Sequence, residues 1–125
     1  MTAAGGGGRL ESSPESPLAL RRVSAAIGSW IGRLGEVWVE GQIASLTRRP
    51  GVGTQFLVLR DTEASVSMTV TCARSVLDAA DAADVAEGSR VVLRARPDFY
   101  AERGALQLRA TAIRRVGLGE LLARL

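Results

Sequence analysis

The sequence lacks the residues on which several kinds of chemistry depend. It contains no histidine and a single cysteine, Cys72. Without imidazole a zinc site and His-based acid–base catalysis are disfavoured, and one cysteine cannot form an intramolecular disulfide. No apolar run approaches the length of a membrane span, and the N-terminus has no apolar signal-peptide core. We therefore expect a cytoplasmic protein with no membrane partner and no cofactor bound to this chain.

Lysine is absent too, so all 16 basic residues are arginine. The formal net charge is +3. The acidic residues concentrate in residues 73–88, so the remaining sequence is more basic than this total implies. The planar fork of arginine can grip two phosphate oxygens, which favours an anionic partner only weakly. Aromatic residues are also scarce (two Trp, two Phe and one Tyr), and this limits the surfaces on which bases could stack.

At 125 residues with 46% hydrophobic content, the chain should form one domain with a core. Residues 1–16 contain GGGG and SSPESP, a composition typical of a disordered tail. Residues 17–35 carry an apolar stripe at helical spacing and predict a helix packed on the domain. Ser16 would be its N-cap, Pro17 a first-turn residue, and Gly35 its end.

Residues 36–116 predict five strands with one helix among them. The first strand carries Gly41 in its interior, which predicts a sharp bend and a change of pairing partner on either side of it. A helix is expected over residues 73–87, between the third and fourth strands. From their alternation and turn residues the strands are 37–46, 55–61, 65–72, 91–96 and 105–116.

This order predicts a mainly β fold, a five-stranded OB-fold Greek-key barrel with an N-terminal helix and a helix between strands 3 and 4. OB-folds bind nucleic acid strands or oligosaccharides across strands 2 and 3 and two loops. Here the loops are residues 47–53 and 97–104, because Pro97 is expected to end pairing of the fourth strand. The leucine stripe in residues 117–125 predicts the start of a helical linker that is cut off, as if it led into something missing.

Candidate contact residues come from these loops and from the outward positions of the strands. Arginines would bind phosphates, and Phe56 or Tyr100 would stack on a base. Three alternatives remain open. Phe56 would instead pack beneath the N-terminal helix or a neighbouring loop, and Tyr100 would anchor its loop. Arg94 and Arg96 would simply lie on a solvated strand face. Cys72 falls on an apolar strand face, which indicates a core thiol. The nucleic-acid-binding candidates are Arg48, Arg49, Phe56, Arg60, Thr69, Arg94, Tyr100 and Arg103.

Four short motifs follow one another in order: VWVEGQI at 37–43, FLVLRD at 56–61, YAERG at 100–104 and GLGEL at 117–121. Together they resemble the N-terminal OB-fold domain of the exodeoxyribonuclease VII large subunit, over roughly residues 18–125. The chain departs from that pattern at Thr54, where the family usually has His, and at Leu57 and Leu106, where it usually has aromatic residues. These departures lower the stacking capacity expected of the site.

In the family, a large subunit and several copies of a small subunit degrade single-stranded DNA to oligonucleotides. The resemblance implies that this domain presents single-stranded DNA to a catalytic domain absent from the chain. No catalytic residue carries over, so the chain alone should be inactive. The alternative is a module that docks on the catalytic domain or another subunit without touching DNA. A metal nuclease built on Asp61 and the 78–84 carboxylates is disfavoured, since a solvated acidic helix face explains those carboxylates.

Overall fold

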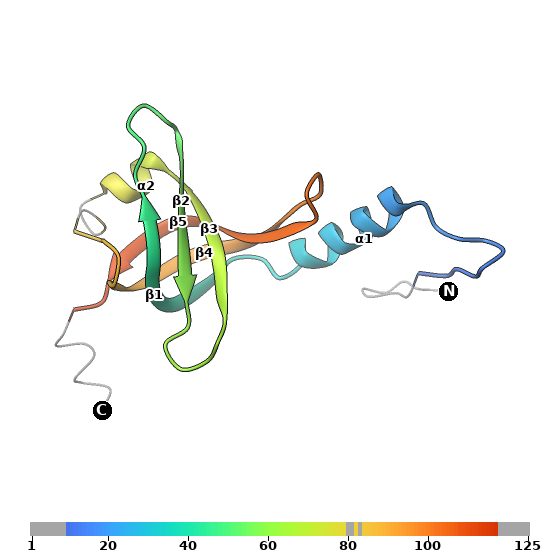
Figure 1. Cartoon of the computed structure of the whole chain (residues 1–125), viewed down its shortest axis with the longest axis horizontal. Helices are drawn as coiled ribbons and strands as arrows, with labels where there is room; N and C mark the ends of the chain where they lie inside the picture. Colours follow the sequence, from blue (N-terminus) through green and yellow to red (C-terminus); the bar gives the residue numbers. More distant parts are fainter. Residues whose placement is uncertain (1–9, 80–81, 83, 118–125) are drawn as a thin grey trace.

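A computed structural model of the chain describes residues 10–79, 82 and 84–117. Five strands form a closed barrel in the order β1-β2-β3-β5-β4, in which β3 and β5 run parallel and all other neighbours are antiparallel (Figure 1). The predicted order of helix, three strands, helix and two strands is confirmed, and so is the OB-fold. The elements are α1 (Leu20–Gly32), β1 (Val37–Thr47), β2 (Thr54–Arg60), β3 (Ser67–Ala73), α2 (Arg74–Asp78), β4 (Arg90–Tyr100) and β5 (Ala105–Arg115).

Strand β1 closes the barrel by pairing with two neighbours in succession. Its first half, up to Gln42, pairs with β4, and its second half, from Gln42 onward, pairs with β2. The predicted change of partner beside Gly41 is therefore correct, although the register shift itself falls between Ile43 and Ser45. Gly41 serves close packing: a Cβ there would lie 2.8 Å from Leu59 Cγ and 2.9 Å from the Arg60 carbonyl oxygen. A larger residue would push β1 and β2 apart.

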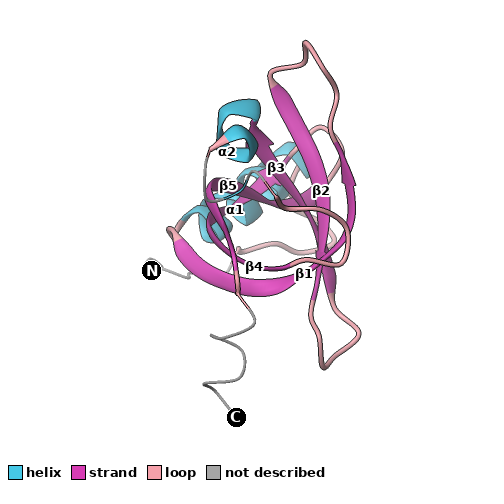
Figure 2. Cartoon of the chain, turned by 90° about the vertical axis from the view of Figure 1, so that its left-hand side faces the viewer, coloured by secondary structure: helices cyan, strands magenta, loops and turns pink. Residues whose placement is uncertain are grey.

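The core fills the inside of the barrel. Every strand contributes side chains, and Val70, Val91 and Leu93 are completely shielded from solvent. Helix α2 lies against β3 and β5 (Figure 2), and its Leu77 is 1% exposed. The helix predicted over 73–87 is shorter than expected, because after Asp78 the chain turns and buries Ala82 and Val85 against the same core.

Two predicted strand faces need correction. Alternation along β3 predicts Thr71 on the solvent side, opposite Val70 and Cys72, yet Thr71 is only 7% exposed. In β5 a register shift pairs Arg94 with Ala112 but Ala95 with Ala110, so Thr111 is an extra residue. This bulge reverses the alternation, and Ile113 rather than Ala112 joins the buried core.

The prediction that Pro97 ends pairing is wrong. Strand β4 continues to Tyr100, Pro97 lies opposite Leu108, and only residues 101–104 form the turn. Beyond Ala95, β4 has no neighbour on its β1 side, so a residue without an N–H is tolerated at this edge. Residues 98–107 therefore form a hairpin that projects from the barrel (Figure 1), and we call it the β4–β5 arm.

Helix α1 packs on this arm. A Cβ on Gly28 would lie 3.7 Å from Phe99 Cδ2, and α1 makes its main tertiary contacts with β4. No α1 residue is fully buried. The predicted start at Ser16 and Pro17 is wrong, since the helix begins after Ala19 without a side-chain cap. Ser16 instead bonds Ser13 in a small turn. The tail residues 1–9 and the leucine stripe from Leu118 lie outside the described residues.

Candidate nucleic-acid interface

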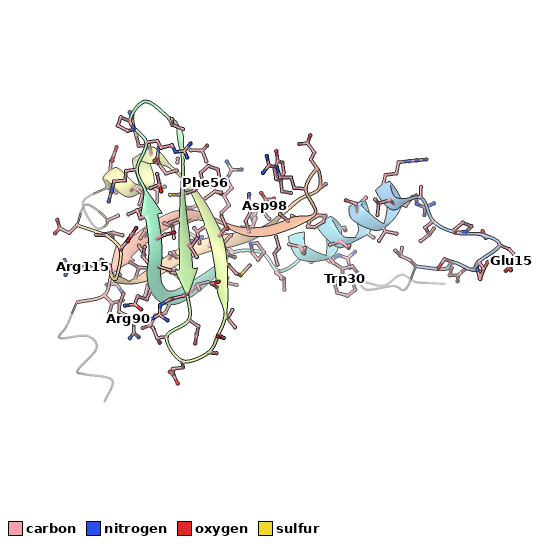
Figure 3. All side chains as sticks on the ribbon, in the orientation of Figure 1. Glu15, Trp30, Phe56, Arg90, Asp98 and Arg115 are labelled. Carbon is pink, nitrogen blue, oxygen red and sulfur yellow. The ribbon has the colours of Figure 1, made fainter. Side chains whose placement is uncertain are left out.

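A groove opens where the β4–β5 arm leaves the barrel beside β3. Its volume is about 330 Å³, at the lower end of the range for small-ligand pockets. In Figure 3, Phe56 is labelled at the upper part of β2, and Asp98 is labelled just above the ribbon of β4 and β5. We call this the β3–β5 groove, and its lining consists of Thr54, Phe56, Thr71, Cys72, Ala73, Asp98, Tyr100, Gln107 and Arg109.

Strand register brings the groove residues together from four strands. Phe56 lies opposite Thr71, Thr71 lies beside Arg109, and Arg109 lies opposite Arg96. Residues paired in this way share one face of a sheet. Phe56 is 51% exposed, and α1 has its main contacts on β4, so Phe56 does not pack beneath that helix. Its ring is accessible for stacking.

Tyr100 lines the far side of the groove. It ends β4 rather than lying in a loop, and it is 43% exposed. The Arg103 guanidinium carbon lies 6.0 Å from the centre of the Tyr100 ring, at the outer limit of a cation–π contact. Two of the predicted residues, Phe56 and Tyr100, thus share the groove, and Arg103 borders it.

A second hollow of about 410 Å³ adjoins the groove. It is lined by Glu36, Arg96, Asp98, Arg109 and Thr111, so the two hollows share Asp98 and Arg109. Within the described part of the chain, neither Arg96 nor Arg109 forms an ion pair. Their charges are available for phosphates at this junction.

Other predicted arginines lie elsewhere or are held by protein groups. Arg48 Nη2 donates to the Val85 carbonyl at 3.0 Å. The backbone N–H of Arg49 donates to Oε1 of the buried Gln55 at 2.7 Å, which fixes the 48–53 loop. Arg48 and Arg49 line a separate hollow of about 180 Å³ beside α2.

Three further predicted residues also fall outside the groove lining. Arg60 Nη2 donates to Gln42 Oε1 at 2.6 Å, near the opposite end of β2. Arg94 Nη2 forms an ion pair with Glu36 at 2.8 Å. Thr69 pairs with Val58 on the outer face that also carries Phe56. Contact of each of these residues with nucleic acid remains a prediction.

Sequence reasoning missed Asp98, Gln107 and Arg109 as groove residues. Two-residue alternation along β5 places Gln107 and Arg109 on its outer face, opposite Leu108 and Ala110. What hid them was the parallel register of β5 with β3, which brings Arg109 beside Thr71. Asp98 was hidden by the mistaken end of β4 at Pro97.

Cys72 and Asp61, the other side chains considered for chemistry, stabilise the fold. Cys72 is 3% exposed, and burial raises the pKa of its thiol despite the opposing influence of Arg48, so the predicted core thiol is confirmed. Asp61 Oδ2 accepts the backbone N–H groups of Glu63 and Ala64, both at 2.8 Å. Over the described ranges no three His, Cys, Asp or Glu side chains cluster as metal ligands. In those ranges no helix is long and apolar enough to cross a membrane.

A closed five-stranded barrel of this topology defines an OB-fold protein, and comparison with known proteins gives the same class. Residues 18–114 match the OB-fold nucleic acid binding domain, and the chain belongs to this family. Among solved structures it is similar to a chain of the S. pombe Stn1–Ten1 complex, with a TM-score of 0.55 and 15% identity, covering 71% of this chain and 63% of that one. The N-terminal domain of PriB from Thermoanaerobacter tencongensis gives a TM-score of 0.50 with 17% identity, covering 66% and 96%. At these identities the likeness concerns the fold alone.

Among curated proteins the resemblance is narrower. The chain is 59% identical over 114 residues to the exodeoxyribonuclease 7 large subunit of Streptomyces coelicolor, and 48% identical over 115 residues to that of Mycobacterium tuberculosis. These matches cover 91% and 92% of this chain but 28% of each relative. The resemblance predicted from the motifs is confirmed, and the chain spans little more than a quarter of those proteins.

Proposed function

We propose that this chain binds single-stranded DNA across the outer faces of β2 and β3 and along the β3–β5 groove. The observation that carries the proposal is the meeting of two exposed aromatic rings, Phe56 and Tyr100, with Arg96 and Arg109, which form no ion pair with any described residue. Single-strand binders combine these features, aromatic planes for bases and cationic groups for phosphates.

We further propose the role that this binding has in a longer protein. The relatives are named as exodeoxyribonuclease large subunits, and this chain matches 28% of their length. The domain would hold single-stranded DNA for hydrolysis to oligonucleotides by a catalytic region outside this chain, in a cytoplasmic assembly with a small subunit. The chain alone would bind DNA without cutting it.

The test is fluorescence anisotropy of a labelled single strand and a matched duplex at two salt concentrations. We expect preference for the single strand and an affinity that falls steeply with salt. Phe56→Ala and Tyr100→Ala should each weaken binding by about 1–3 kcal/mol if each ring stacks on a base. Trp30→Ala is the matched control, because Trp30 is 51% exposed, like Phe56, but lies on α1. Absence of single-strand binding by the folded chain at low salt would contradict the proposal.

A second candidate is a protein-docking or assembly module without DNA contact. The observation in its favour is a set of exposed apolar side chains on α1, the turn after it and the start of β1: Leu20, Ile27, Trp30, Leu34, Val37 and Trp38. Contiguous exposed apolar surface often marks a protein interface. Failure to bind DNA, together with partner binding that is insensitive to salt and lost in Trp38→Ala, would favour this module.

A further inference from the structure

A carboxylate lies in the middle of the proposed DNA face. Asp98 lines both the groove and the adjoining hollow, where Arg96 and Arg109 also lie. In the described part of the chain it forms no ion pair with either arginine and accepts no hydrogen bond. Asp98 therefore neither orients these arginines nor is neutralised by them. A carboxylate in this position repels phosphate, so general affinity for DNA does not explain it.

An amide lies directly beside that carboxylate. Gln107 on β5 is the cross-strand partner of Asp98 on β4, and both line the groove that holds Phe56 and Tyr100. Opposite residues have Cβ atoms about 4.5–5.5 Å apart, so the two polar ends can reach one ligand together. A carboxylate offers only acceptors, whereas an amide also offers two N–H donors.

We propose that the β3–β5 groove selects guanine from the bases of a single strand. Asp98 would accept the N1–H and N2–H groups of the base, and the Gln107 amide would donate to O6. This inference rests on the proposed function, because it names the base that the same site prefers. The aromatic rings beside this pair can stack on any base, whereas the hydrogen bonds of Asp98 and Gln107 would make guanine the preferred base.

The other bases match this pair poorly. Guanine presents two adjacent donors next to an acceptor on its pairing edge. Thymine presents one N–H between two carbonyl oxygens, which a carboxylate repels. Adenine and cytosine each present an amino group beside a ring nitrogen whose lone pair also repels a carboxylate. Only guanine satisfies Asp98 with both oxygens and Gln107 at the same time.

The adjoining hollow completes the arrangement. A base held at Asp98 would have its neighbouring phosphate within reach of Arg96 and Arg109, which share that hollow with Asp98. The carboxylate then faces a base edge while the guanidinium groups face the backbone. Base contact and phosphate contact are separated on the two sides of one junction.

The experiment uses oligothymidylate of about 12 nucleotides, a length within the range of OB-fold sites. One central thymidine is replaced by deoxyguanosine, deoxyinosine, deoxyadenosine or deoxycytidine, and each oligonucleotide is titrated against the chain by fluorescence anisotropy. A single guanine should tighten binding about five- to tenfold over the all-thymine strand. Inosine, which lacks only the N2 amino group, should lose most of that gain.

Variants distinguish recognition of guanine by Asp98 and Gln107 from a general effect of negative charge on DNA binding. Asp98→Asn and Gln107→Ala should each abolish the guanine preference, while Glu102→Gln, which removes the same charge from the turn beside the groove, should retain it. Equal binding of all five oligonucleotides, or of guanine and inosine, overturns the inference and leaves the proposed function standing. An equal rise in affinity for every oligonucleotide in Asp98→Asn also overturns it, since Asp98 would then act only by repulsion. The guanine–inosine comparison uses the unmodified chain, so it decides the question even if a variant fails to fold. Loss of all single-strand binding would instead be the failure of the proposed function.

Discussion

Strands β4 and β5 belong both to the closed barrel and to the β4–β5 arm, but the two regions are stabilised differently. Within the barrel, Val91, Leu93 and Ala95 of β4 are completely buried, with neighbours on both sides. Beyond Ala95 the strand has β5 as its only sheet neighbour. There Phe99 is partly buried, while Tyr100 and Leu106 are 43% and 48% exposed.

Under the proposed function, the barrel would supply stability and the arm would supply part of the surface that binds DNA. Alternation along β4 turns Phe99 toward α1 and turns Asp98 and Tyr100 toward the groove. Helix α1 thus supports the arm from behind while the groove side remains open. Substitutions in the barrel should change the free energy of unfolding, and substitutions on the groove side of the arm should change binding with little effect on folding.

The largest effect should come from the barrel core. Leu93→Ala removes a completely buried side chain and should lower the free energy of unfolding by about 2–5 kcal/mol, from lost burial and the cavity left behind. Leu106→Ala on the arm is the matched control and should cost less than about 1 kcal/mol. Urea unfolding followed by circular dichroism measures both. Equal losses would mean that the arm belongs to the same packed unit as the barrel.

A smaller loss of unfolding free energy should follow from crowding at Gly41, where β1 changes its pairing partner. Gly41→Ala places a methyl group 2.8 Å from Leu59 Cγ and 2.9 Å from a backbone oxygen, and should cost about 1–3 kcal/mol. Gly53→Ala is the control, because no atom lies within 4 Å of its added methyl group and its φ is not positive. The same urea titration compares the two variants. A neutral Gly41→Ala would show that β1 and β2 can separate without loss.

Much of the barrel was predictable because two-residue alternation reports local burial. Four apolar positions of β2 and β3, Leu57, Leu59, Val70 and Cys72, are in the core as alternation indicates, while Met68 on the same face is half-buried. Alternation failed at the Thr111 bulge, where one inserted residue reverses the faces of β5. A bulge depends on how two strands pair, and a single strand's sequence does not record that.

The groove was only half predictable for a related reason. Phe56 and Tyr100 could be named from residue type and position, but the groove also depends on the parallel register of β3 with β5 and on the continuation of β4 through Pro97. Proline stops pairing only where its N–H would be needed, and at this edge it was not. The sequence also does not show that Arg48 donates to the Val85 carbonyl or that Arg94 on β4 pairs with Glu36.

The loss of DNA affinity on substituting an arginine should depend on whether that arginine already forms an ion pair within the protein. Arg109→Ala removes a guanidinium that forms no ion pair in the part of the chain that the structure describes. It should therefore weaken single-strand binding for all sequences and reduce the slope of log affinity against log salt by about 0.7. Arg94→Ala removes one paired with Glu36 and should change that slope less. Anisotropy titrations over a salt series measure both. A larger effect of Arg94→Ala would move the phosphate path away from the groove.

The smallest effect should come from the β2–β3 turn, an exposed part of the barrel. The backbone N–H groups of Glu63 and Ala64 lower the pKa of Asp61 below its ordinary value of 3.8, with a minor contribution from Arg90. Since the folded pKa lies below the unfolded one, the ionised carboxylate stabilises the fold above about pH 4, and this contribution disappears as the pH falls through the folded pKa.

Asp61→Ala should therefore lower the thermal midpoint at pH 7, and the gap to the unmodified chain should narrow steadily below pH 4. Glu63→Gln is the control, because the backbone N–H rather than the side chain of Glu63 binds Asp61, and its midpoint should follow that of the unmodified chain. A gap that stays constant with pH would mean that Asp61 stabilises the turn by shape and not by charge. Exposed residues of the barrel would then resemble those of the arm, and stability would depend on the buried core alone.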